Sequence, residues 1–169
     1  WGRDRYWHPS RKTMDSITTA IPLMPKWDAI HTTIIRNNRF RCDNGWDIDL
    51  DDGSSNYLII NNLCLNGGIK LREGFFRTVE NNIMVNNGFH PHLLFKKSED
   101  VFHRNIVSTK IQDIRLDGWG KEIDYNLFPD ETTLLDARKH NVDKNRAFGD
   151  PLFIDPKKGD FRVKNSSPA

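Results

Sequence analysis

The sequence predicts an all-β fold, a parallel β-helix built from coils of about 22 residues. Three observations favour this fold class. An asparagine recurs after apolar residues at a nearly constant spacing, apolar residues keep fixed positions around it, and a second alternating apolar pattern follows further along each unit. The recurring asparagines are Asn38, Asn62, Asn82, Asn105 and Asn126.

The steps between these asparagines are 24, 20, 23 and 21 residues, which is too short for a helical repeat pair or a propeller blade. The apolar residues three positions before them are Ile35, Ile59, Val79, Phe102 and Ile123. Those two positions after them are Phe40, Cys64, Met84, Val107 and Phe128. We expect the coils to stack at roughly 4.8 Å. The asparagines would then form an inward ladder at a bend, with each side-chain amide bonding to a neighbouring coil.

A second pattern with the period of a β-strand appears in "DIDLDDG", "GIKLREG", "HLLFKKS" and "DIRLDGW". Its expected inward positions are Ile48, Ile69, Leu93 and Ile114, followed two residues later by Leu50, Leu71, Phe95 and Leu116. A leucine-rich repeat has a similar unit length. Its Leu-x-x-Leu-x-Leu signature is missing here, and β-branched residues outnumber Leu in the predicted strands.

We expect residues 1–169 to form one domain, a piece of a longer β-helix. Residues 1–30 are predicted to be an irregular flank lying over the coils, and residues 31–128 form about five coils. Residues 129–169 are predicted to cap the solenoid with a short helix, which Asp130 or Thr132 would begin, and a final pair of strands.

Composition and charge exclude several classes of partner. Lys and Arg total 25 against 23 Asp and Glu, so the net charge of +2 gives no reason to expect a nucleic acid or a membrane surface as partner. No apolar run approaches the length of a membrane span. Cys42 and Cys64 match no metal motif, and we interpret them as core thiols, with a disulfide as the less favoured alternative. The sequence indicates no oligomeric state.

The segment "WDIDLDDG" crowds four aspartates onto one predicted strand, where Asp is disfavoured and like charges repel. Because Ile48 and Leu50 are expected to point inward, the aspartates beside them point outward. Residues that disfavour the local structure, with no local interaction to compensate, indicate a functional site. The four aspartates are Asp47, Asp49, Asp51 and Asp52.

The expected alignment of coils places cations next to these carboxylates. One outward row would contain Asp49, Lys70, Leu94 and Arg115, and the other Asp51, Arg72, Lys96 and Asp117. Asp52 would align with Glu73, just before the glycines that turn the chain. The non-functional interpretation of these rows is a ladder of surface ion pairs between adjacent strands.

The functional interpretation is hydrolysis of a glycosidic bond, which needs two carboxyl groups at a fixed separation. Asp51 or Asp52 lies one coil from Glu73, roughly 5 Å away, as a retaining mechanism requires. Asp49 and Asp51 lie roughly 7 Å apart on one strand, within the inverting range. We favour Glu73 as acid/base, its pKa raised by anionic neighbours, paired with an aspartate nucleophile.

Other side chains near this strand are candidates for binding substrate. Lys70 or Arg72 would also keep the nucleophile ionised. His90-Pro91-His92 is a weak metal motif, because no third ligand follows at a helpful spacing, and we predict no resident metal or cofactor for a hydrolase. The candidate substrate-binding residues are Asp47, Lys70, Arg72, His90, His92 and Trp119. Further aromatic residues that could stack on sugars are Trp46, Phe75, Phe76 and Phe89.

Two alternatives remain open. The same patch could bind Ca²⁺ and cleave an acidic polysaccharide by elimination, with Lys70, Arg72 or Lys96 as the base. A non-catalytic carbohydrate-binding or structural β-helix segment would instead have its charges paired throughout and no cleft. Carboxylates in excess of cations at one edge of the patch favour the enzyme.

Longer phrases of the sequence carry a resemblance to a known family. They are "GWDIDLDDGSSNYLIINNLCLNGGIKLREG", "NNIMVNNGFHPH", "WGKEIDYNLFPDE" and "GDPLFIDPKKGDFRV". Over residues 30–169 the chain resembles the right-handed parallel β-helix proteins of bacterial carbohydrate metabolism, in the pectate-lyase-like superfamily. Within that superfamily it is most similar to glycoside hydrolases of the β-xylosidase type.

The resemblance implies an extracytoplasmic enzyme that acts on plant-type or host oligo- or polysaccharides. It also implies an Asp nucleophile and a Glu acid/base in neighbouring coils, which fall by position on Asp51, or Asp49 or Asp52, and on Glu73. Such enzymes have several more coils before this point, so the resemblance implies that part of their substrate-binding surface lies outside this chain.

Overall fold

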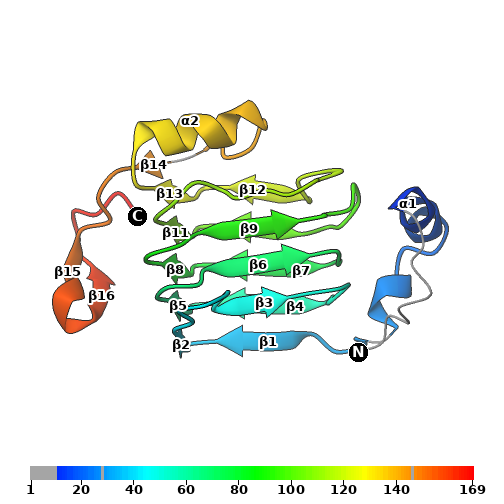
Figure 1. The fold of residues 1–169 in the computed structure, drawn as a ribbon, viewed down its shortest axis with the longest axis horizontal. Helices are drawn as coiled ribbons and strands as arrows, with labels where there is room; N and C mark the ends of the chain where they lie inside the picture. Colours follow the sequence, from blue (N-terminus) through cyan, green and yellow to red (C-terminus); the bar gives the residue numbers. More distant parts are fainter. Residues whose placement is uncertain (1–10, 28, 146) are drawn as a thin grey trace.

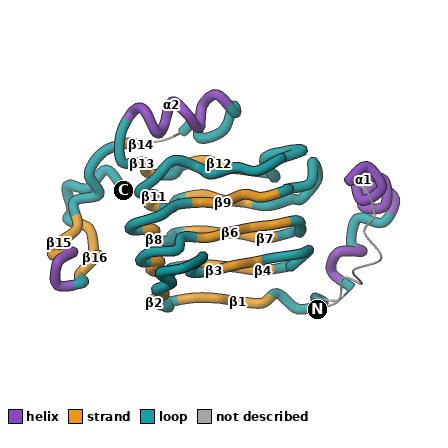
Figure 2. The backbone as a smooth tube through the Cα atoms, in the orientation of Figure 1, coloured by secondary structure: helices purple, strands orange, loops and turns teal. Residues whose placement is uncertain are grey.

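The computed structural model describes residues 11–27, 29–145 and 147–169, and it confirms a parallel β-helix of about five turns. Three parallel sheets lie around the stack of coils, and the first three coils contribute a strand to each of them (Figure 1). Short strands alternate with turns and loops in every coil (Figure 2). We call these sheets A, B and C.

Sheets A and B run the length of the stack. Sheet A contains β1 (Thr33–Arg36), β4 (Tyr57–Ile60), β7 (Arg77–Glu80), β10 (Val101–His103) and β12 (Glu122–Asp124). Sheet B contains β2 (Arg39–Phe40), β5 (Leu63–Cys64), β8 (Ile83–Met84), β11 (Ile106–Val107), β13 (Leu127–Phe128) and β14 (Ala147–Phe148). Sheet C contains β3 (Ile48–Leu50), β6 (Ile69–Arg72) and β9 (Phe89–His92).

The core lies between the three sheets, and the apolar rows predicted around the asparagines fill it. Every member of both rows is buried except Ile35 and Phe40 of the first coil, which are partly buried. Phe89 of sheet C stacks on Phe102 of sheet A, with ring centroids 3.9 Å apart. Side chains from different sheets therefore meet directly inside the solenoid.

The predicted asparagine ladder is confirmed. Its hydrogen bonds run from each Asn side-chain Nδ2 to the Oδ1 of the next coil, at 3.1 Å for Asn38 to Asn62 and 3.0 Å for Asn62 to Asn82. The same pattern continues through Asn105 to Asn126. Each acceptor oxygen also receives the preceding asparagine's backbone N–H, so the ladder satisfies buried polar groups at the bend between sheets A and B.

The predicted register of sheet C is wrong from the third coil onward. β9 is formed by Phe89–His92, so that Lys70 pairs with His90 and Arg72 with His92. Leu94 and Phe95, which were expected in the strand, are instead buried in the turn that follows it. Ile114 forms a bridge to His92 and is exposed rather than inward. Lys96 and Arg115 therefore do not continue the charged rows.

Helices and a hairpin flank the solenoid. Helix α2 (Glu131–Lys139) lies across the end of the stack (Figure 1). Asp130 caps its first turn, because the Asp130 Oδ1 accepts a hydrogen bond from the Thr133 N–H. Asp130 is one of the two residues predicted to begin this helix. The predicted C-terminal strand pair is the antiparallel hairpin of β15 (Phe153–Asp155) and β16 (Asp160–Val163), joined by η2 (Pro156–Lys158), and it lies beside sheet B.

The N-terminal flank is not wholly irregular within the described residues. It contains helix α1 (Arg11–Ala20) and the short helix η1 (Met24–Lys26). Thr18 is buried and lines the same cavity as Phe75, while Lys26 lies 4.7 Å from the Phe76 ring centroid. The predicted flank also includes residues 1–10, which lie outside the described residues.

Both cysteines are free thiols; Cys64 lies in the core as predicted, whereas Cys42 is only partly buried. Burial, reinforced by the negative charge of Asp47, raises the pKa of Cys64 to about 12, so this thiol stays neutral in the core. Among the described helices, none has the length and apolar character needed to cross a bilayer.

Candidate functional site

The observed register brings two charged rows together on the outer face of sheet C. The first is Asp49, Lys70 and His90, and the second continues from Asp51 through Arg72 to His92. Trp46 stands beside both histidines, with ring centroids 6.0 Å from His90 and 5.8 Å from His92. We call this group the C-sheet cluster; its members are Trp46, Asp49, Asp51, Asp52, Lys70, Arg72, His90 and His92.

Lys70 is the buried centre of the C-sheet cluster. Its side chain is 5% exposed, and its Nζ lies 2.7 Å from Asp49 Oδ1 and 3.3 Å from Asp51 Oδ1. The ammonium also lies 4.0 Å from the centroid of the Trp46 ring, at cation–π distance. Burying an ammonium is costly unless anions compensate it, so the lysine requires the two aspartates.

Arg72 connects the remaining carboxylates. Its Nη1 lies 3.2 Å from Asp51 Oδ1 and 3.4 Å from Asp52 Oδ1, and its Nε lies 4.0 Å from Glu73 Oε2. Asp49, Asp51 and Asp52 therefore each have a cation partner. A ladder of surface ion pairs would show the same pairing. These contacts alone therefore do not distinguish such a ladder from a catalytic site.

The cations of the C-sheet cluster lower the pKa of Asp51. Burial works to raise the pKa of Asp51, but the hydrogen bond and charge of Lys70, together with the charge of Arg72, outweigh it and hold this pKa below its usual value. Asp51 is therefore ionised at neutral pH. It is the carboxylate of this face that two cations contact.

The two histidines of the C-sheet cluster are neutral at pH 7. Burial lowers the pKa of His90 to about 4, assisted by His92 and by the positive charge of Lys70. Burial and then the charges of Lys70 and Arg72 also lower the pKa of His92. The ring nitrogen Nε2 of His90 lies 2.8 Å from the Asn87 side-chain oxygen, which fixes the orientation of this ring.

Asp52 and Glu73 occupy equivalent turn positions in adjacent coils. Both have left-handed backbone conformations, with φ of 37° for Asp52 and 36° for Glu73, which are uncommon for residues other than glycine. The Asp52 side chain is 53% exposed, whereas the Glu73 side chain is 12% exposed. The two equivalent turn residues therefore differ mainly in how far their carboxyl groups reach solvent.

Two predicted substrate-binding residues lie in other surroundings. Both oxygens of Asp47 already accept backbone hydrogen bonds, one from Cys42 at 2.6 Å and the other from three consecutive residues including Gly67 at 2.7 Å. A side chain at Gly67 would collide with this backbone. Trp119 packs against the core, with its ring centroid 4.6 Å from that of His140. Asp47 therefore shapes the loop that leads into β3.

Sequence reasoning missed one buried ion pair near the cluster. Arg77 is fully buried and donates from Nε and Nη2 to the two oxygens of Asp100, at 2.9 and 2.6 Å. Its Nη1 donates to the Arg72 carbonyl oxygen at 3.0 Å. This bidentate pair fixes the turn between sheets C and A. An Arg and an Asp 23 residues apart, one repeat, were the only signal for it.

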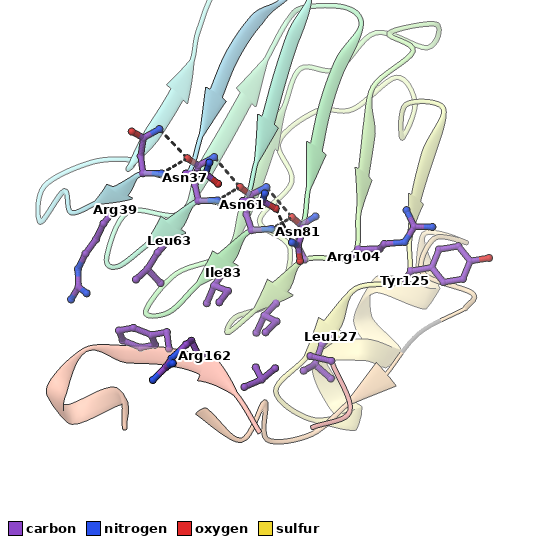
Figure 3. Close-up of a pocket in the computed structure, with 18 of the residues that line it drawn as sticks. Asn37, Arg39, Asn61, Leu63, Asn81, Ile83, Arg104, Tyr125, Leu127 and Arg162 are labelled. Carbon is purple, nitrogen blue, oxygen red and sulfur yellow. Dashed lines mark hydrogen bonds between the residues drawn. The ribbon is translucent and has the colours of Figure 1, made fainter. Parts of the chain in front are cut away.

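The sequence did not indicate a groove of about 720 Å³ that lies between sheet B and the C-terminal hairpin (Figure 3). The asparagine ladder separates this groove from the core. Most of the groove's polar residues come from the turns between sheets A and B, while Arg39 belongs to β2 and Arg162 to β16. In the described part of the chain, no group of three or more His, Cys, Asp or Glu side chains is arranged to hold a metal ion.

Comparisons with protein-family models, with curated proteins and with solved structures found no match to this chain. The fold therefore defines it as a parallel β-solenoid protein, and its activity has to be argued from the chemistry of its surfaces.

Proposed function

We propose that the chain forms part of a glycoside hydrolase whose catalytic groups lie on the outer face of sheet C. The observation that carries the proposal is that a buried lysine contacts two carboxylates, Asp49 and Asp51, side by side at the end of β3. Aspartate is disfavoured in β-strands, so these residues do not favour the strand itself. Glycoside hydrolysis passes through a positively charged sugar transition state, which fixed carboxylates stabilise.

The proposed roles follow from exposure and charge. Asp51 is the nucleophile, because Lys70 and Arg72 keep it ionised while 46% of its side chain stays exposed to a ligand. Glu73, one coil away and 12% exposed, is the proposed acid/base. His92 and Trp46 lie at the edge of the same face and would contact the sugar through a neutral ring nitrogen and an aromatic surface.

The likeness of the longer sequence phrases to β-helical hydrolases of the pectate-lyase-like superfamily supports the same proposal. On that basis the substrate is an oligo- or polysaccharide, and the enzyme acts outside the cytoplasm. No resident cofactor is proposed for this reaction.

The test is release of sugar from a panel of aryl glycosides and polysaccharides by the wild type and by Glu73→Gln and Asp51→Asn, each with and without EDTA. We expect both variants to lose at least about 100-fold in kcat, as removal of an acid or a nucleophile does, and EDTA to have no effect. Glu99→Gln, on an exposed turn, is the matched control. Turnover that both variants retain would overturn the assignment.

The second candidate is eliminative cleavage of a uronate-containing polysaccharide. The observation that favours it is a neutral His92 beside Lys70 and Arg72. Arg72, whose side chain is 35% exposed, would bind the uronate carboxylate, and a neutral base would remove the proton on the adjacent carbon while the glycosidic oxygen leaves. Unsaturated products detected by ultraviolet absorbance in the same panel would select this reaction. Their loss in EDTA would support the calcium dependence predicted for it.

A further inference from the structure

The groove beside sheet B is bordered on one side by a row of exposed turn residues. One residue per coil occupies the same left-handed position, with φ between 52° and 60°. They are Asn37, Asn61, Asn81, Arg104 and Tyr125, and Figure 3 shows them following one another along the stack. Arg104 and Tyr125 adopt this conformation too, so the turn itself does not require an amide.

The amides of this row offer hydrogen bonds to a ligand. The Asn81 Nδ2 donates to Asn61 Oδ1 at 2.7 Å, which aligns the two side chains. The Nδ2 of Asn61 and the whole side-chain amide of Asn37 have no hydrogen-bond partner among the described residues. Because successive coils are spaced by roughly 4.8 Å, the row presents repeated donors and acceptors along a line.

The floor and the far wall of the groove are largely apolar. The outward side chains of sheet B, among them Leu63 and Ile83, form the floor, and β16 of the C-terminal hairpin contributes Phe161 and Val163 to the wall (Figure 3). Tyr125 is 50% exposed at the end of the row. A long groove with an apolar floor and a polar rim suits an extended ligand that has both C–H faces and hydroxyl edges.

The charges at the groove are mostly compensated. Arg104 pairs with Glu80 at 3.1 Å, and Arg162 pairs with Asp160 at 2.6 Å. Arg39 donates to the carbonyl oxygen of Gly159. With two of its three arginines paired, the groove complements a neutral ligand better than a polyanion. It also lacks a free strand edge in its middle coils, since β5, β8 and β11 are each paired on both sides, so an added peptide strand is disfavoured.

We infer that this groove binds a neutral oligosaccharide that lies along the axis of the solenoid, at a site separate from the C-sheet cluster. The inference stands without the proposed hydrolase activity, because it uses none of the same side chains. In a protein with both sites, the groove holds a glycan chain without cleaving it.

The test is isothermal titration calorimetry with xylohexaose and cellohexaose, alongside hexagalacturonate and an extended hexapeptide. We expect saturable binding of at least one neutral hexasaccharide. The double variant Asn61→Gly/Asn81→Gly, which removes two amides while keeping a residue suited to the left-handed turn, should weaken that binding at least tenfold. Tyr125→Ala should weaken it independently, and thermal melting checks that both variants fold.

The matched control is Glu99→Gln, an exposed position outside both the groove and the C-sheet cluster, which should leave hexasaccharide affinity within twofold of the wild type. Absence of binding by both neutral hexasaccharides would overturn the inference. So would preferential binding of hexagalacturonate or the peptide, or affinity that is lost in Asp51→Asn and kept in the groove variants. Failure of glycoside hydrolysis with groove binding intact would refute the proposed function alone.

Discussion

The Nζ of Lys70 lies 2.7 Å from Asp49 Oδ1, although the lysine side chain is 5% exposed and the aspartate side chain 38%. The cation is thus buried beneath anions that reach solvent. The pairing compensates the buried ammonium, whereas partly exposed carboxylates are solvated without a partner. Its main effect on the surface is to hold carboxylate oxygens at set positions on sheet C.

Replacing Lys70 with methionine removes this cation while keeping most of the packing volume. We expect the pKa of Asp51 to rise, because the hydrogen bond and charge that lower it are lost and burial then dominates. Carboxyl ¹³C titration by NMR measures the change. The control is Lys96→Met, an exposed position outside the cluster. An unchanged titration of Asp51 in Lys70→Met would show that Lys70 does not set its ionisation.

Asp143 ends the asparagine ladder, where it accepts from Asn126 Nδ2 at 2.8 Å. Burial raises its pKa from 3.8 to about 6, despite the hydrogen bonds from Asn126 that lower it. Because the folded pKa lies above the unfolded one, this group stabilises the fold fully below pH 3.8, and that stability is lost as pH rises through 6. The shift of about 2 units corresponds to roughly 3 kcal/mol.

Asp143→Asn should therefore stabilise the protein at neutral pH by about 1 to 3 kcal/mol, since the amide still accepts from Asn126 and asparagine tolerates the left-handed backbone at this position. Urea unfolding between pH 4 and 8 measures the gain, with the exposed Asp136→Asn as control. A variant less stable than the wild type at pH 7.5 would contradict the account.

His90 gives the opposite pH dependence. Its pKa is depressed from 6.5 to about 4, so the stability it contributes is present above pH 6.5 and is lost as pH falls through 4. We expect its imidazole resonances not to titrate above about pH 5, and His90→Gln to remove the loss of stability on acidification. NMR titration and urea unfolding measure the two effects. A His90 midpoint between pH 6 and 7 would show that the ring is not desolvated.

The buried pair of Arg77 and Asp100 should be the most sensitive ion pair of those described here. Asp100→Asn leaves a fully buried guanidinium without its anion, which costs about 3 to 5 kcal/mol. The exposed pair of Lys139 and Asp136 supplies the comparison, because loss of its partner costs less than about 1 kcal/mol. Chemical denaturation of Asp100→Asn and Asp136→Asn distinguishes them, and equal losses would refute the assignment.

The ladder and the core rows were predictable because they repeat. An inward asparagine at each bend and apolar residues at fixed distances from it recur in every coil, and each copy checks the others. The register of β9 was not predictable from the same pattern. His90, Pro91 and His92 look unlike a strand, whereas the neighbouring Leu94 and Phe95 look like one but fill a buried turn.

Contacts between neighbouring coils decide which of the site residues could be predicted from the sequence. The position of Asp49 over Lys70 was predictable because both lie in strands of regular spacing. The role of Asp47 was not, since its carboxylate is held by backbone N–H groups of the next coil's turn, including that of Gly67, and no side-chain pattern marks those donors. Neutral histidines likewise depend on burial, which follows from the register.

The most direct test of the proposed hydrolase is to trap its covalent intermediate with a 2-deoxy-2-fluoro glycoside of the sugar that the wild type releases. The account predicts one glycosyl adduct per chain by intact mass spectrometry, located on Asp51 by peptide mapping and absent from Asp51→Asn. An adduct on a residue outside sheet C, or steady turnover with no adduct on Asp51, would contradict it.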